Sequence, residues 1–133
     1  MTYHSSNVST APHYVWGAGC DGWRLLDDSS LSIVQERVPP SAGEVAHFHV
    51  KARQFFYVLS GTATMEFEDG TVTFGAGEGL HVPPGTPHRF VNCSDTDVVF
   101  LVVSAPSTTG DRIPASERRH ESFHARQQEL SEQ

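Results

Sequence analysis

Short segments rich in apolar and β-branched residues make up the middle of the chain. They cover residues 31–38, 55–60, 62–68, 71–74, 80–82, 88–91 and 98–103. In 71–74 apolar and polar positions alternate, whereas 55–60 and 98–103 are nearly continuous apolar runs. Val, Phe and Thr are common in them, as is typical of β-strands. Glycine and proline turn signals separate the segments at intervals of roughly 8 to 12 residues, and no segment between them has helical periodicity. The pattern predicts an all-β sandwich or barrel.

The two ends of the chain differ in composition from this middle part. We divide the chain into an N-terminal arm with one or two further strands over 1–27, a barrel over 28–106 and a polar tail over 107–133. Within the tail, residues 117–130 are mostly charged or polar, and Phe123 and Leu130 are the large apolar side chains there. We expect this stretch to form a short helix capped by Ser116 or a disordered tail.

The overall composition is that of an ordinary globular domain, and it excludes several classes of function. The chain has 133 residues, of which 38% are hydrophobic and 19% charged, enough for one domain with a single core. No apolar run approaches the roughly 20 residues of a membrane-spanning helix, and no secretory signal is visible. The net charge of −7 argues against a nucleic-acid partner. With two cysteines only, we expect a cytoplasmic protein with free thiols.

Histidine is the residue type in clear excess, with eight histidines against a single lysine. Four of them lie in the polar ends of the chain. His47 and His49 are two positions apart in a predicted strand, so their side chains share a face and can bind one metal ion. His88 follows a Pro-Pro-Gly turn that starts a later strand. This spacing makes a metal site a candidate function.

These histidines lie in two motifs that resemble those of the cupin superfamily. The second cupin motif, G-x5-PxG-x2-H-x3-N, matches at every fixed position, namely Gly77, Pro83, Gly85, His88 and Asn92. The first motif, G-x5-HxH-x3,4-E-x6-G, matches in part, at His47, His49 and Gly61. Gly43 lies closer to the histidine pair than the motif asks, and Gln54 occupies the glutamate position. Residues 53–59 and 104–112 are also similar to a group of short cupins of unassigned function.

The resemblance implies a double-stranded β-helix, the jelly-roll barrel of RmlC-like cupins, in a single domain that commonly forms a homodimer. It also implies one divalent metal ion inside the barrel, with His47, His49 and His88 as ligands. Gln54 either ligates the metal through its carbonyl oxygen or hydrogen-bonds a metal-bound water. Imidazole and carbonyl ligands suit iron, manganese, nickel and zinc alike, so the identity of the metal stays open.

The glutamine leaves the implied ligand set without a negative charge. A metal that keeps its full charge is a stronger Lewis acid and binds anionic or chelating oxygen ligands well. The same charge disfavours the higher-valent iron that oxygen activation needs. We therefore expect an isomerase or lyase acting on a small oxygen-rich substrate such as a sugar acid or keto acid. The alternatives are an iron-dependent dioxygenase and a non-enzymatic metabolite sensor.

The ligand set is also similar to that of a small cupin that converts unsaturated uronates to their keto form. That enzyme is thought to use a carboxylate and an aromatic residue on a late barrel strand. Residues 98–103 supply no carboxylate here. The catalytic carboxylate of that enzyme therefore does not carry over to this chain.

Three further residues are candidates for catalysis. His81 is predicted near the pocket, where it would act as a general base, hydrogen-bond a metal ligand or be a fifth ligand itself. The alternative is a histidine without a role in the site, in the barrel wall or at the surface. On the strand 31–38, Glu36 and Arg37 have opposite parity, so one of them faces the site. Glu36 would suit proton transfer and Arg37 an anionic substrate.

A set of apolar residues has the parity to line the pocket. They predict a largely apolar cavity around the metal, although a place in the core is the commoner fate of such residues. The residues are Phe56, Val58, Met65, Phe67 and Phe90.

Overall fold

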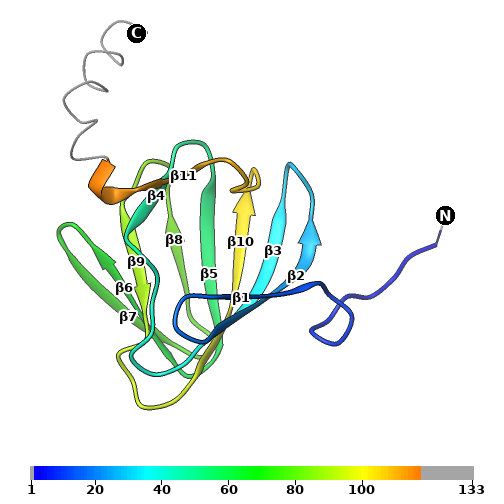
Figure 1. Ribbon diagram of the computed structural model, residues 1–133, viewed down its shortest axis with the longest axis horizontal. Helices are drawn as coiled ribbons and strands as arrows, with labels where there is room; N and C mark the ends of the chain where they lie inside the picture. The colour runs from blue at the N-terminus through cyan, green and yellow to red at the C-terminus, as the bar shows by residue number, and fades with distance from the viewer. Residues whose placement is uncertain (1, 118–133) are drawn as a thin grey trace, which may run out of the picture.

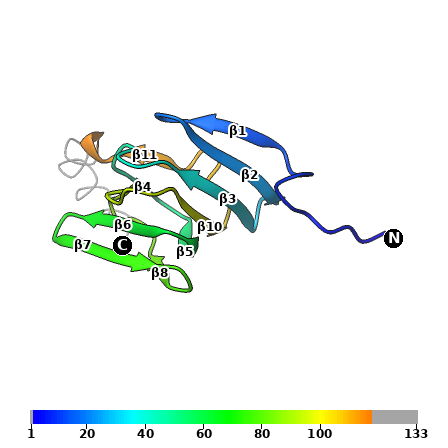
Figure 2. The same cartoon turned by 90° about the horizontal axis from the view of Figure 1, so that it is seen from below.

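Two antiparallel sheets form the protein in the computed structural model, which describes residues 2–117 (Figure 1). The six-stranded sheet has the order β1 (His13–Trp16), β2 (Cys20–Asp27), β3 (Ser32–Val38), β10 (Val98–Ala105), β5 (Arg53–Ser60) and β8 (Gly79–Val82). The five-stranded sheet has the order β11 (Arg112–Pro114), β4 (His47–His49), β9 (His88–Val91), β6 (Thr62–Phe67) and β7 (Gly70–Gly75). Viewed from below, β1, β2 and β3 lie on one side of the molecule and β6, β7 and β8 on the other (Figure 2). The predicted all-β jelly-roll domain is confirmed.

Alternating burial shows how the sequence pattern builds these sheets. Along β10 buried and half-buried residues alternate, and along β5 the buried residues are Gln54, Phe56 and Val58. Their neighbours Arg53 and Tyr57 are exposed on the outer face. Since one face of each strand packs inward, the register between strands is well specified.

Three phenylalanines pack at the centre between the sheets. The rings of Phe90 and Phe100 stack with centroids 4.1 Å apart, and Phe56 lies 6.1 Å from Phe90. Full burial of each such side chain stabilises the fold by about 1.5–3 kcal/mol. Phe56 also contacts the ring of His88 edge-on at 6.1 Å, so this aromatic core supports the histidines.

Close packing requires a glycine at the start of β6. Gly61 has a positive φ of 85°, and a Cβ there would lie 2.4 Å from the carbonyl oxygen of Asp97. Only glycine accommodates both features without displacing backbone. This is the glycine that ends the first cupin-like motif.

Both flanking segments contribute strands to the sheets. β1 and β2 extend the six-stranded sheet beyond β3, and β11 pairs with β4. Residues 115–117 adopt helical backbone, whereas the rest of the predicted C-terminal helix lies outside the described residues. Within the described part, no helix is long and apolar enough to cross a membrane.

Candidate metal centre

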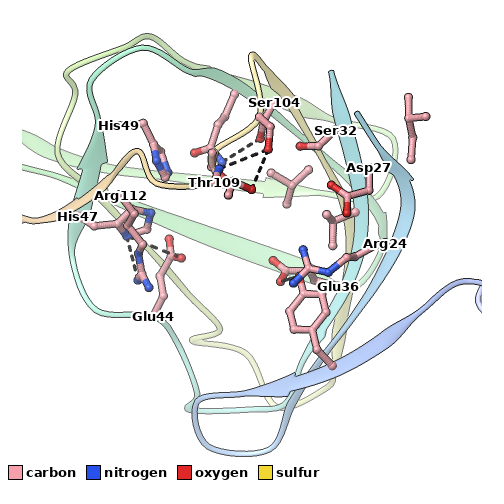
Figure 3. A pocket seen from close by; sticks show the side chains of 17 residues that line it. Arg24, Asp27, Ser32, Glu36, Glu44, His47, His49, Ser104, Thr109 and Arg112 are labelled. Carbon is pink, nitrogen blue, oxygen red and sulfur yellow. Dashed lines mark hydrogen bonds and ion pairs between the residues drawn. The ribbon is translucent and has the colours of Figure 1, made fainter. Parts of the chain in front are cut away.

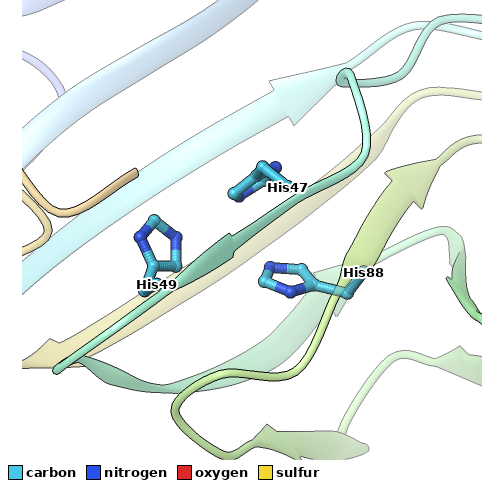
Figure 4. Close-up of side chains that lie close together, drawn as sticks. All are labelled: His47, His49 and His88. Carbon is cyan, nitrogen blue, oxygen red and sulfur yellow. The ribbon is translucent and has the colours of Figure 1, made fainter. Parts of the chain in front are cut away.

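Three histidines from two neighbouring strands converge inside the barrel (Figure 4). His47 and His49 extend from β4, and His88 from β9 is the register partner of His47. Their available ring nitrogens all lie within 4.8 Å of one another, and each residue is at most 5% exposed. The structure thus brings together the three histidines that the sequence predicted as ligands.

Backbone carbonyls orient each of the three rings. The Nδ1 atoms of His47 and His88 lie 2.8 Å from the carbonyl oxygens of Val45 and Thr86. His49 Nδ1 lies 3.2 Å from the carbonyl oxygen of Asp111. Because a carbonyl only accepts, these contacts assign the proton to Nδ1 and leave each Nε2 with a free lone pair. Arg112 Nη2, which lies 3.3 Å from His47 Nδ1, donates to the Val45 carbonyl in this arrangement. Metal-binding histidines are held in the same way.

Burial keeps these rings neutral. It lowers the pKa of His47 to about 3 and that of His88 to about 4, and it also lowers the pKa of His49. The neighbouring rings and Arg112 act in the same direction on His47 and His88. The three lone pairs are therefore available to a metal ion throughout the neutral pH range.

Gln54 presents its side-chain oxygen without a partner. Its Nε2 donates to Ser104 Oγ at 3.2 Å, across the pairing of β5 with β10. Among the described residues, Gln54 Oε1 and His88 Nε2 are both buried and have no hydrogen-bond partner. Leaving such atoms buried and unpaired is costly, and a divalent cation satisfies both of them. The three histidines therefore fit one metal ion, and ligation by the Gln54 oxygen stays a prediction.

A cavity of about 170 Å³ adjoins His47 and His49, whereas His88 is not among its lining residues (Figure 3). An engineered cavity of about 150 Å³ holds benzene, so this space suits a molecule with one small ring or a short chain. Much of its wall is formed by β2, by β3, by the loop that follows β10, and by β11. Most of the lining residues are polar. They include Tyr14, Arg24, Asp27, Ser32, Glu36, Glu44, His47, His49, Gln54, Ser104, Thr109 and Arg112.

The apolar residues predicted for the pocket lie in the hydrophobic core. Four of them are fully buried there and Phe67 packs against them, and none of the five is among the residues that line this cavity. A contact between these residues and a substrate stays a prediction. The residues are Phe56, Val58, Met65, Phe67 and Phe90.

The structure places the three predicted catalytic residues in different surroundings. Glu36 has the inward parity on β3 and lines the cavity. Arg37 has the opposite parity. Its Nε donates to Asp21 at 2.8 Å and its Nη1 donates to Asp97 at 3.2 Å. His81 is exposed on β8, next to the buried Val82. Their catalytic roles stay predictions, and the placement favours Glu36.

Glu36 is a carboxyl group with a shifted proton affinity. Burial raises its pKa to about 7, and the hydroxyl of Tyr14, which donates to Glu36 Oε2 at 2.8 Å, opposes this rise. Arg112 and Arg24 oppose it more weakly. A carboxyl group with this pKa can both accept and donate a proton near neutral pH.

The site also contains residues that sequence reasoning missed. Glu44 accepts a hydrogen bond from the Phe90 amide at 3.0 Å, and burial raises its pKa to about 8. Arg112 Nη2 lies 3.3 Å from the Val45 carbonyl, which also accepts from His47. Glu44 directly follows Gly43, the glycine of the first motif, and this neighbourhood could have identified Glu44 from the sequence. Arg112 lies in a polar stretch without strand alternation, so its sequence carried no signal.

The family model for the Cupin domain matches residues 34–104, and the chain belongs to this family. A curated relative is an uncharacterized protein from Methanocaldococcus jannaschii, 25% identical over 75 residues. These residues are 56% of this chain and 60% of the relative, so the match spans less than two thirds of that protein.

Solved structures share the fold at low identity. A structure from Silicibacter pomeroyi, described as a sugar phosphate isomerase of a cupin superfamily, superposes with a TM-score of 0.70 at 22% identity. The match covers 78% of this chain and 76% of that one. The polyketide cyclase RemF from Streptomyces resistomycificus superposes with a TM-score of 0.70 at 23% identity, covering 85% and 83%. At this identity the likeness shows the fold alone.

Proposed function

We propose that the protein is a metal-dependent enzyme of the isomerase or lyase type, acting on a small oxygen-rich substrate such as a sugar acid or keto acid. The observation that carries the proposal is that one cavity is lined both by His47 and His49 of the histidine cluster and by Glu36, a carboxyl group of near-neutral pKa. His47, His49 and His88 hold the divalent ion, and Gln54 Oε1 completes the set. Bound there, such an ion supplies Lewis-acid polarisation of a carbonyl or hydroxyl oxygen.

Glu36 moves the proton in this proposal. Its carboxylate takes a proton from a carbon or hydroxyl next to the polarised oxygen, and the resulting acid returns it at a second position. The exchange leaves no net proton, as an isomerisation requires. Hydroxyl groups of Ser32, Ser104 and Thr109 line the same cavity and are available to bind substrate oxygens. The polar lining supports an oxygen-rich substrate over an apolar one.

The fold neighbours give this proposal indirect support. One of them is described as a sugar phosphate isomerase and another as a polyketide cyclase, and both descriptions are those of enzymes. The metal remains one of iron, manganese, nickel or zinc, since all four accept imidazole and amide ligands. A homodimer and a cytoplasmic location stay predictions. Light scattering on the purified protein tests for the homodimer.

The test uses the full chain loaded with each of these metals and a panel of sugar acids and keto acids in D2O. Proton NMR follows deuterium uptake at carbons beside a carbonyl. We expect uptake with at least one compound, its loss in Glu36→Gln and His88→Ala, and its retention in Glu68→Gln, a change at an exposed glutamate. Full activity in Glu36→Gln would contradict the assigned base.

Two other outcomes would replace the proposal by an alternative. Oxygen consumption by the iron-loaded protein with the same panel would indicate a dioxygenase. A ligand that co-purifies and is released unchanged, with no turnover of any compound, would indicate a metabolite sensor.

A further inference from the structure

A row of paired residues crosses three neighbouring strands at the wall of the cavity. Tyr14 on β1 pairs with Gly22 on β2, and Gly22 pairs with Glu36 on β3. Side chains in such a row point to the same side of the sheet. Tyr14 spans the middle strand, and its hydroxyl reaches Glu36 Oε2 at 2.8 Å.

The glycine at the centre of the row is what allows this reach. A Cβ built on Gly22 would lie 2.1 Å from Tyr14 Cζ and 2.4 Å from its hydroxyl oxygen. The phenol ring thus occupies the space in which any other residue would place its side chain. The guanidinium carbon of Arg24 lies over the ring, 4.5 Å from its centroid, and this contact also holds the ring in place.

We propose that Tyr14 is a positioning residue that directs the Glu36 carboxylate into the cavity and sets its proton affinity, and that Gly22 is the space this contact needs. The functional importance of this contact rests on the proposed proton transfer by Glu36. The positioning itself does not depend on any substrate, so it can be tested separately.

Some of the groups around Glu36 favour its charged form, and burial opposes it. Tyr14 and the indole of Trp16 from β1, Arg24 from β2 and Arg112 from β11 favour the carboxylate. Burial opposes them, and Cys20 and Glu44 also interact with Glu36 electrostatically. Tyr14 itself keeps its proton, because burial and the Glu36 charge raise its pKa far above the usual range. It therefore acts as a permanent donor to Glu36 and not as a second base.

The experiment measures the pKa of Glu36 directly in the full chain. Side-chain carboxyl carbons of ¹³C-labelled glutamate are titrated by NMR, and the resonances of Glu36 and Glu44 are assigned with Glu36→Gln and Glu44→Gln. The wild-type pKa is expected at about 7. Tyr14→Phe removes one hydrogen bond to the charged form and is expected to raise this pKa by about one unit.

Gly22→Ala is the second variant, and it is expected to produce a similar rise because its methyl group displaces the Tyr14 ring. The matched controls are Tyr57→Phe, on the exposed face of β5, and Gly75→Ala, where a Cβ comes no closer than 3.7 Å to other atoms. Neither control is expected to move the Glu36 pKa. If Gly22→Ala fails to fold, Tyr14→Phe, which keeps the ring, still decides the question.

Two results would separate this inference from the proposed function. An unchanged Glu36 pKa in Tyr14→Phe, or an equal shift in the controls, would overturn the positioning role whatever the activity. Full turnover in Glu36→Gln would overturn the proposed base while leaving a measured shift in Tyr14→Phe intact. Once a substrate is known, the pH profile of kcat/KM in Tyr14→Phe is expected to move by the same amount as the Glu36 pKa.

Discussion

At the scale of single residues, Gln54 sets the charge of the candidate centre. Its amide donates to Ser104 and leaves Oε1 buried without a hydrogen-bond partner. A glutamate at this position would bring a negative charge into the ligand set. The glutamine instead leaves the whole charge of a bound cation to act on the substrate.

Substitution of Gln54 tests whether its oxygen is a ligand. Gln54→Leu keeps the size of the side chain and removes the oxygen, and it is expected to weaken Zn²⁺ binding by about tenfold. Gln54→Glu is expected to strengthen binding, because the added charge attracts the cation. Competition with a fluorescent chelator measures both affinities. Ser104→Ala, which removes only the partner of the amide nitrogen, is the control, and equal affinity in Gln54→Leu would show that the oxygen does not ligate.

At the scale of elements, a segment just before and within β11 braces both histidines of β4. The carboxylate of Asp111 accepts hydrogen bonds from the amides of Val50, Lys51 and Ala52 at 2.9–3.2 Å. Its carbonyl accepts from His49, while Arg112 binds the carbonyl that accepts from His47. One dipeptide thus ties the loop after β4 and both rings to the rest of the barrel.

Loss of the Asp111 carboxylate is expected to weaken both the fold and the site. Asp111→Ala leaves three amides without their acceptor, so we expect a loss of about 2 kcal/mol in the free energy of unfolding. The looser support of His49 is expected to weaken Zn²⁺ binding by about tenfold. Urea unfolding of the chelator-treated protein measures the first effect and chelator competition the second. Asp95→Ala, at an exposed loop position, serves as control; the same values in both variants would disprove the bracing role.

The elements also show where sequence reasoning succeeded and where it stopped. Short β-rich runs and turn residues predicted the central strands, and the spacing of His47 and His49 placed both rings on one face. β11 could not be predicted, because Arg-Ile-Pro is too short to show a period. The choice between Glu36 and Arg37 needed the inward face of β3, which depends on packing against distant strands. The polar lining of the cavity follows from segments that close over the site only in the folded chain.

At the scale of the whole molecule, the site gathers buried groups whose pKa values are shifted in opposite directions. Glu36 and Glu44 have a pKa raised by burial to about 7 and about 8, so they bind more protons in the folded chain than in the unfolded chain. His47 and His88 have a pKa lowered to about 3 and about 4, so they bind fewer. The histidines therefore make stability rise with pH and the glutamates make it fall, over pH ranges that overlap below neutrality.

The metal-free protein is expected to be most stable at mildly acidic pH. Between pH 3 and the ordinary histidine pKa, the unfolded chain binds more protons through His47 and His88, so stability rises with pH. From the ordinary glutamate pKa up to about 8, the folded chain binds more protons through Glu36 and Glu44, so this contribution falls. Thermal unfolding at a series of pH values measures the sum. Glu44→Gln is expected to flatten the alkaline decline, and an equally steep decline would contradict the assignment.

The central claim is that this cupin barrel holds one divalent metal ion between β4 and β9. The most direct measurement is calorimetric titration of the chelator-treated full chain with Zn²⁺, together with His88→Ala and with His81→Ala as a control at an exposed histidine. The expected result is one equivalent bound by the wild type and by His81→Ala, with affinity lost at least a hundredfold in His88→Ala. Absence of binding to the wild type, or undiminished binding to His88→Ala, would contradict the claim.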